Sequence, residues 1–150
     1  MVKSSIVSDS TCLIGMERIQ SLEILPSIFD SIVIPPEVQQ EFGNEFPWLR
    51  VEAPSNHGLV RSLKLLVDDG EAEAIALAYE KSWRVILDDR HARAVAKRLD
   101  VTVIGTVGIL VKAKQQGHIV SVRPLIEQLE MKGFYISKAL KQEALRLAVE

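Results

Sequence analysis

Five acidic residues are widely separated along the 150-residue chain, yet a parallel α/β fold would bring them to one edge of a sheet. They are Asp9, Glu41, Glu71 and the adjacent pair Asp88 and Asp89. Strand-like apolar runs lead directly into Asp9 and into the adjacent pair. Carboxylates gathered at one place repel each other unless they are protonated or neutralised by a cation. Mg²⁺ and Mn²⁺ prefer all-oxygen surroundings, so the sequence predicts a metal-dependent site.

Helical spacing distinguishes two acids in the alanine-rich segment 71–81. The residues three, four and seven positions after Glu71 form an apolar stripe, whereas the same offsets from Glu73 drift toward polar residues. Residues two apart on a helix point to nearly opposite sides, so only one of the two acids can enter a site. We expect Glu71 to face it. The alternative is that Glu71 is simply a favourable acid in the first turn of its helix.

The remaining acids leave alternatives open. Glu41 flanks the apolar edge formed by Val38 and Phe42, although an ordinary solvated helix residue would also fit there. Asp88 and Asp89 must diverge at the end of a strand. We therefore expect one of them to enter the site and the other to cap the following helix, and the sequence does not choose between them.

A basic stripe follows the adjacent aspartates. Arg90, Arg93 and Lys97 are spaced by three and four residues, so they share one face of a helix that begins beside the acids. Such a stripe could bind the phosphates of a nucleic acid, and the alternative is a solvated charged face. With a net charge of −2 on the whole chain, any polyanion must be bound by a local patch of this kind.

Strand-like and helix-like segments alternate along the sequence, which favours a mostly parallel sheet of four to five strands covered by helices in one domain over residues 1–150. Strands are expected at residues 5–8, 31–34, 85–87 and 101–104, with a short edge strand or a loop at 48–54. Helices are expected at residues 13–25, 37–42, 59–67, 71–81, 90–99, 107–116, 122–131 and 137–149. No apolar run is long enough to cross a membrane, and the single cysteine, Cys12, fits a reducing cytoplasm.

The ordered acidic segments resemble the PIN-domain family of metal-dependent ribonucleases, which includes toxins of toxin–antitoxin pairs. The resemblance covers most of the chain. Its segments are Asp9-Ser10-Thr11, Pro35-Pro36-Glu37-Val38-Gln39-Gln40-Glu41, Gly70-Glu71-Ala72-Glu73-Ala74, and Leu87-Asp88-Asp89-Arg90. The stretches Ile104-Gly105-Thr106-Val107-Gly108 and Gly133-Phe134-Tyr135-Ile136-Ser137 are similar to one prokaryotic branch of that family. The glutamate at position 71 differs from the aspartate that many members have there.

The resemblance implies a three-layer α/β/α domain, often a homodimer, that binds one or two Mg²⁺ or Mn²⁺ ions. It also implies that Asp9 is the central ligand, helped by Glu71 and by Asp89 or Asp88, while Glu41 orients water or a second ion. Ser10 or Thr11 would hydrogen-bond these carboxylates.

The expected function is therefore RNA cleavage by metal-activated water, with an antitoxin protein as a possible partner. The alternative is an inactive RNA-binding or protein-interaction module on the same fold. A phosphatase with an aspartate nucleophile would need an acid two residues after Asp9, where this chain has Thr11.

Overall fold

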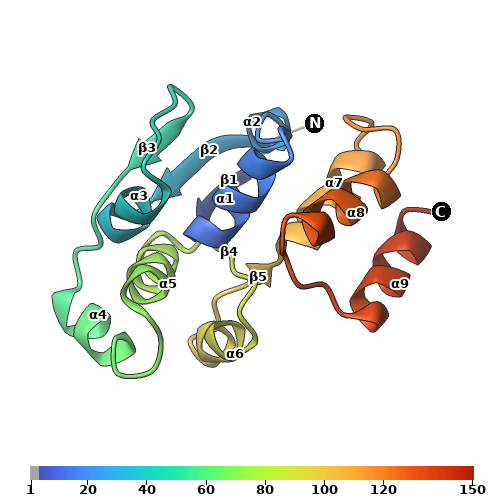
Figure 1. The fold of residues 1–150 in the computed structure, drawn as a ribbon. Helices are drawn as coiled ribbons and strands as arrows, with labels where there is room; N and C mark the ends of the chain where they lie inside the picture. The colour runs from blue at the N-terminus through green and yellow to red at the C-terminus, as the bar shows by residue number, and fades with distance from the viewer. Residues whose placement is uncertain (1–3) are drawn as a thin grey trace.

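The computed structural model describes residues 4–150 and contains one five-stranded sheet whose strands are all parallel (Figure 1). The strand order is β3-β2-β1-β4-β5. The strands are β1 (Ser4–Ser8), β2 (Phe29–Ile34), β3 (Leu49–Val51), β4 (Arg84–Ile86) and β5 (Val103–Ile104). β1 lies in the middle of the sheet, so the residue that follows it, Asp9, lies at the centre of the carboxyl edge.

Helices cover the sheet on both faces and give a three-layer α/β/α fold, as the sequence predicted. The helices of residues 4–150 are α1 (Ser10–Arg18), α2 (Ile24–Ile28), α3 (Pro36–Phe42), α4 (His57–Leu63), α5 (Asp69–Lys81), α6 (Arg90–Arg98), α7 (Thr106–Gln115), α8 (Arg123–Met131) and α9 (Lys138–Leu147). The last three helices lie together at one end of the molecule, beyond β5 (Figure 1).

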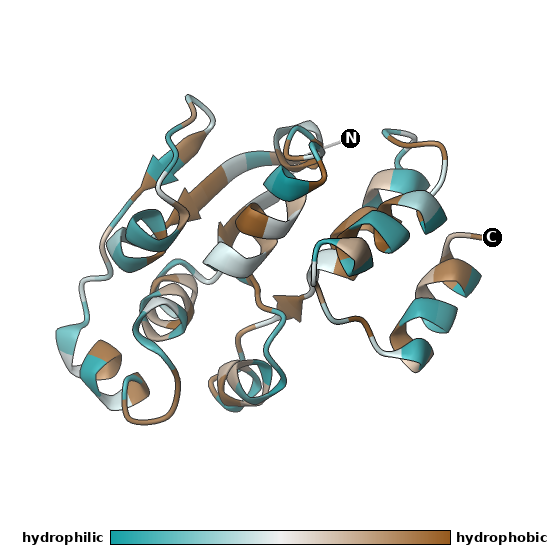
Figure 2. Ribbon diagram, in the orientation of Figure 1, coloured by the Kyte–Doolittle hydropathy of each residue, from teal (hydrophilic) through white to brown (hydrophobic). Residues whose placement is uncertain are grey.

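Helices cover the sheet on both faces, so the inner residues of the central strands are apolar and buried, although β1 begins and ends in serines and Asp30 of β2 is exposed. Ile6, Val7, Val33 and Val85 have no exposed surface. Figure 2 shows the apolar residues concentrated in the strands, with hydrophilic residues on the outer turns of the helices. Burial of these strands fixes their register, and the register fixes where Asp9 and Asp88 leave the sheet.

The helix expected at residues 13–25 is wrong as a single element. The structure has two shorter helices, because Gln20 adopts a left-handed backbone with a φ of 56° and ends the first of them. Ile19 and Leu22 remain buried even though they lie in the break. Their apolar spacing therefore imitated a continuous helix.

The turn between α4 and α5 also differs from expectation. α4 ends at Leu63 rather than near residue 67, and α5 begins at Asp69 rather than at Glu71. Asp68 caps α5, since its Oδ1 accepts a hydrogen bond of 2.7 Å from the backbone N–H of Glu71. Gly70 thus lies inside the first turn of α5 rather than in a turn between two helices. Of the two alternatives at residues 48–54, the structure has the short edge strand β3.

Across residues 4–150 we find no helix of the length and apolar character that a membrane span requires.

Candidate metal centre

Asp9 is the most enclosed acid at the carboxyl edge. It directly follows β1, and its backbone N–H donates a 3.1 Å hydrogen bond to the carbonyl of Ile86 at the end of the neighbouring β4. Only 6% of Asp9 is exposed. Burial, reinforced by the charges of Asp68, Glu41 and Asp88, raises its pKa to about 7, although the backbone of Ser10 opposes the shift.

Glu41 reaches the same point from α3. A methyl group built on Gly70, in the first turn of α5, would overlap Oε1 of Glu41 and would lie 3.6 Å from Oδ1 of Asp9. The missing side chain of Gly70 therefore makes room for two carboxylates from two other elements. Partial burial and then the charge of Asp68 raise the pKa of Glu41, while a hydrogen bond from the Ser10 side chain lowers it. Ser10 thus lies near enough to Glu41 to affect its pKa, and a role for Ser10 in holding the acids stays a prediction.

Glu71 serves two purposes in the structure. It forms a capping box with Asp68, because its Oε1 accepts a 3.2 Å hydrogen bond from the Asp68 backbone N–H. It is also only 8% exposed, and its pKa is raised to about 7, first by burial and then by the charges of Asp68, Asp9 and Asp89. Glu71 therefore both caps the start of α5 and lies near Asp9, so the two expectations for this residue are compatible.

Glu73 points elsewhere. Its Oε1 accepts a 3.1 Å hydrogen bond from the backbone N–H of Glu37 at the start of α3. The structure thus places Glu71 beside Asp9 and Glu73 against α3, in agreement with the helical spacing.

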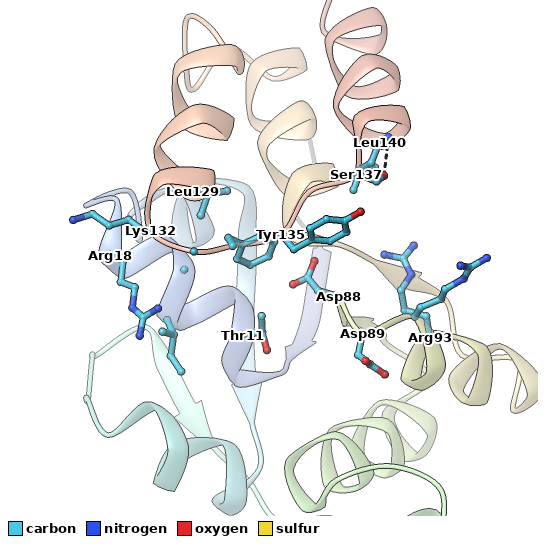
Figure 3. A pocket seen from close by; sticks show the side chains of 15 residues that line it. Thr11, Arg18, Asp88, Asp89, Arg93, Leu129, Lys132, Tyr135, Ser137 and Leu140 are labelled. Carbon is cyan, nitrogen blue, oxygen red and sulfur yellow. Dashed lines mark hydrogen bonds between the residues drawn. The ribbon is translucent and has the colours of Figure 1, made fainter.

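Asp88 and Asp89 diverge at the end of β4 (Figure 3). Asp88 crosses to the start of α7, where its two oxygens accept hydrogen bonds of 2.8 Å and 2.6 Å from the N–H and the hydroxyl of Thr106. Asp89 caps α6 by accepting a 2.8 Å hydrogen bond from the Ala92 N–H. Their charges act on different neighbours, since Asp88 raises the pKa of Asp9 and Asp89 raises that of Glu71.

The three members of the expected basic stripe do not behave alike. Arg90 and Lys97 are exposed, but Nη1 of Arg93 donates a 3.3 Å hydrogen bond to the Leu87 carbonyl. Arg93 is held so close that a methyl group on Gly105 would lie 2.7 Å from its Nη1 and 3.2 Å from Oδ1 of Asp88. The Arg93 charge also lowers the pKa of Asp88, against a larger increase from burial. Arg93 is therefore partly engaged with the protein while Arg90 and Lys97 are not, and phosphate binding by the three residues stays a prediction.

Two residues important to the site were missed in the sequence. Asp68 contributes to the raised pKa of Asp9, Glu41 and Glu71, and the pattern of an aspartate three residues before Glu71 could have identified it as a cap. Thr106 is fully buried and binds Asp88 from 18 residues away, a pairing that no local spacing reveals. Thr11, expected beside the acids, is exposed and lines a neighbouring cavity with Asp88.

Among residues 4–150, no group of three or more acidic, histidine or cysteine side chains is already arranged to hold a metal ion. Hydrogen-bond donors engage Glu71, Asp88 and Asp89 in their present orientations. The chemistry nevertheless fits a hard divalent cation, because the donors are all oxygens and no cation is among the causes of the shifted pKa of Asp9 or Glu71. Burial and mutual repulsion favour the protonated forms of Asp9 and Glu71 in the absence of a cation, and a divalent cation would relieve the same repulsion.

A parallel α/β/α domain with acids converging beyond its central strands has a nuclease-type fold. The family model of the PIN domain matches residues 5–150, so this chain belongs to the PIN-domain family. No curated protein matches the chain.

Proposed function

We propose that this PIN domain is an endoribonuclease that depends on Mg²⁺ or Mn²⁺. The observation that carries the proposal is the convergence of Asp9 and Glu41 beside Gly70, with Glu71 near enough to Asp9 for their charges to interact and with the pKa of each acid raised. Such a set of carboxylates repels itself without a positive charge, and a divalent cation is the usual way to supply one.

Asp9 and Glu71 would hold the cation, with Asp89 or Asp88 completing the set and Glu41 orienting a water molecule. When bound, the cation supplies Lewis-acid activation of that water and stabilises negative charge on the phosphoryl group. The reaction is hydrolysis: the water oxygen bonds to phosphorus while the bond to one ribose oxygen breaks. The surrounding carboxylates take up the proton that the water releases.

Several protein residues fix the acids before a substrate arrives. Thr106 holds Asp88 through two hydrogen bonds, and the charge of Arg93 acts on the same carboxylate. Ser10 hydrogen-bonds Glu41. These contacts restrict the acids to a small volume at the carboxyl edge, which lowers the cost of assembling the site.

A toxin of a toxin–antitoxin pair, acting in the cytoplasm as a homodimer with an antitoxin partner, is the biological setting that we propose for this activity. It follows from family membership alone. A small DNA-binding protein encoded by the adjacent reading frame would support it.

A second candidate is an RNA-binding or protein-interaction module without turnover. It is favoured by the engagement of Glu71, Asp88 and Asp89 in helix caps and hydrogen bonds, which leaves no preformed set of three ligands within residues 4–150.

The deciding experiment compares Asp9→Asn with Glu73→Gln, a matched neutralisation whose amide oxygen can still accept the hydrogen bond from Glu37. We expect Asp9→Asn to abolish Mn²⁺-dependent cleavage of a labelled RNA and to remove stabilisation by Mn²⁺ in thermal unfolding. Glu73→Gln should retain both. Cleavage by Asp9→Asn at the wild-type rate would overturn the proposal, and RNA binding without any Mn²⁺-dependent cleavage by the wild type would favour the second candidate.

A further inference from the structure

A cavity of about 1080 Å³ opens beside the acids, between α1, the start of α6 and the loop that joins α8 to α9. Asp88 and Asp89 form part of its wall, so the cavity is continuous with the candidate metal centre. Its cationic lining residues are Arg18, Arg90, Arg93 and Lys132. The cavity therefore presents positive charge directly beside the proposed reaction site, on a chain whose net charge is −2.

The α8–α9 loop places the side chain of Tyr135 at the mouth of this cavity, between two anchored neighbours (Figure 3). Phe134 packs so closely on α1 that a methyl group at Gly15 would lie 3.2 Å from its ring, and its N–H donates a 2.9 Å hydrogen bond to the Leu129 carbonyl. Ile136 is buried on the other side. Tyr135, between these two anchors, is 85% exposed.

The exposure of Tyr135 has no explanation in the packing of the protein. The two neighbours of Tyr135 are both anchored, Phe134 against α1 and Ile136 in the core, while the Tyr135 side chain itself is left in solvent. A serine or lysine would satisfy that position without placing a large ring in water. The ring is thus held by fixed backbone on both sides, over a charged cavity, which is the arrangement of a stacking platform.

We propose that the cavity binds an unpaired segment of single-stranded RNA, with one base stacked on Tyr135 and phosphates bound by Arg18 and Lys132. This inference rests on the proposed ribonuclease function and adds the residues outside the metal centre that would hold the strand. Figure 3 shows Arg18 and Lys132 on one side of Asp88, Arg93 on the other, and Tyr135 in between. A strand held by these residues passes over the acids at the end of β4.

Single-stranded RNA fits this cavity better than a duplex does. The base faces of a duplex are stacked inside the helix and cannot reach a protein ring, whereas unpaired bases stack readily on tyrosine. This proposal gives a role to the segment Gly133-Phe134-Tyr135-Ile136-Ser137. Gly133, with a left-handed φ of 90°, follows the end of α8, and Ser137 caps α9. Between them, Phe134 and Ile136 anchor the loop on either side of Tyr135.

The stacking contact is tested by the affinity of the protein for a fluorescein-labelled oligouridylate, which does not pair with itself, measured in EDTA. Tyr135→Ala should weaken binding by about fivefold or more, and Tyr135→Phe should bind like the wild type. Tyr79→Ala is the matched control, since Tyr79 is also an exposed tyrosine but lies on α5, outside the cavity. An unchanged affinity in Tyr135→Ala, or an equal loss in Tyr79→Ala, overturns the inference.

The phosphate contacts are tested by salt titration of the same binding reaction. Neutralising Arg18 and Lys132 together to glutamine should reduce the slope of log affinity against log salt by about 1.4, for two phosphate contacts on a single strand. The control neutralises Arg98 and Arg123, two exposed arginines at the far ends of α6 and α8 from the cavity. Equal slope changes in the two double variants overturn the inference, as does equally tight, Tyr135-dependent binding of duplex RNA.

The binding assay separates this inference from the ribonuclease proposal because EDTA prevents metal-dependent cleavage. Wild-type binding that depends on Tyr135, without cleavage in Mn²⁺, supports the RNA site and contradicts the nuclease activity. Wild-type cleavage with unchanged binding in Tyr135→Ala contradicts the RNA site alone. Failure of the wild type to bind the oligouridylate also overturns the inference.

Discussion

Asp9 illustrates how a single residue connects the fold to the proposed chemistry. It follows the central strand, where burial and three neighbouring acids raise its pKa to about 7. Glu71 has a similarly raised pKa, again with burial as the first cause. In water either acid would be ionised well below pH 7. The metal-free protein therefore retains protons at this site that its unfolded chain would release.

That difference predicts how stability depends on pH without metal. The folded pKa of Asp9 lies above its unfolded value of 3.8, so the folded protein binds more protons between these two values. The free energy of unfolding should consequently fall as the pH rises from about 4 to about 7. Glu150 does not oppose this trend in the same range, because its pKa is lowered to about 2 and its own contribution is complete above 4.5.

Urea unfolding in EDTA at a series of pH values measures the effect. Asp9→Asn should flatten the decrease, since an amide releases no proton. A stability that rises steadily between pH 5 and pH 7 would show that the acids are less buried or less close than described.

At the scale of the elements, Gly70 is the point where the first turn of α5 makes room for acids from α3 and β1. Gly70→Ala should therefore displace the flexible end of Glu41, which occupies the space of the new methyl group. Helix propensity favours alanine over glycine by about 1 kcal/mol, so the fold should tolerate the change. We expect cleavage and Mn²⁺-induced stabilisation to fall while thermal stability in EDTA stays close to the wild type.

Gly58→Ala in α4 is the matched glycine control, because a methyl group there makes only an ordinary 3.6 Å contact with Asn56. Comparable loss of activity in both variants would mean that Gly70 has no special relation to Glu41.

A second prediction concerns Glu150, whose carboxylate ties the chain just after α9 to α7 and to the start of α8. Glu150 accepts hydrogen bonds from the Ser121 hydroxyl, from the backbone N–H groups of Val122 and Arg123, and from Lys114. Glu150→Ala should therefore increase amide hydrogen exchange in α9 and leave β1 protected.

The matched control is Glu143→Ala, which removes only an exposed contact to Arg146 within the same helix. Equal exchange in the two variants would show that Glu150 does not hold α9 and that other contacts do, such as the buried Ala144 and Leu145 and the ion pair between Lys141 and Glu130.

At the scale of the whole molecule, the basic side chains near the site fall into two kinds, those free to bind RNA and those engaged with the protein. The net charge of −2 provides no general attraction for RNA, so binding must depend on local groups. Arg90 and Lys97 are exposed on α6, whereas Arg93 donates a hydrogen bond to the Leu87 carbonyl and its charge lowers the pKa of Asp88. The first two are available to phosphates, and the third stabilises an acid of the candidate metal centre.

Neutralising the two kinds of basic side chain should therefore have different consequences. Arg90→Gln combined with Lys97→Gln should reduce the salt dependence of RNA binding by about 0.7 per lost contact, with little effect on Mn²⁺-induced stabilisation. Arg93→Gln should instead raise the pKa of Asp88 and alter Mn²⁺-induced stabilisation, with a smaller change in the salt slope. Salt titration and thermal unfolding of each variant measure both quantities, and identical behaviour of the two variants would contradict the separation.

The sequence by itself determined the features that depend on local periodicity. Alternating strands and helices predicted the α/β/α fold and a parallel sheet, and the strand ends at Asp9 and Asp88 followed from short apolar runs. Helical offsets correctly placed Glu71 and Glu73 on different sides of α5. These inferences succeeded because burial of one face imposes a repeat that neighbouring residues reveal.

Only the tertiary structure decided the contacts between segments distant in sequence. It ended α1 at Arg18, just before the left-handed Gln20, and bonded Arg93 to the Leu87 carbonyl. It also joined Thr106 to Asp88 and placed Tyr135 at a cavity shared by α1, α6 and the α8–α9 loop. Each outcome depends on the position of a partner many residues away and on which polar groups remain to be satisfied when the elements pack. Spacing within one segment carries no information about that partner, so the candidate site became recognisable as a set of interacting side chains only in the folded chain.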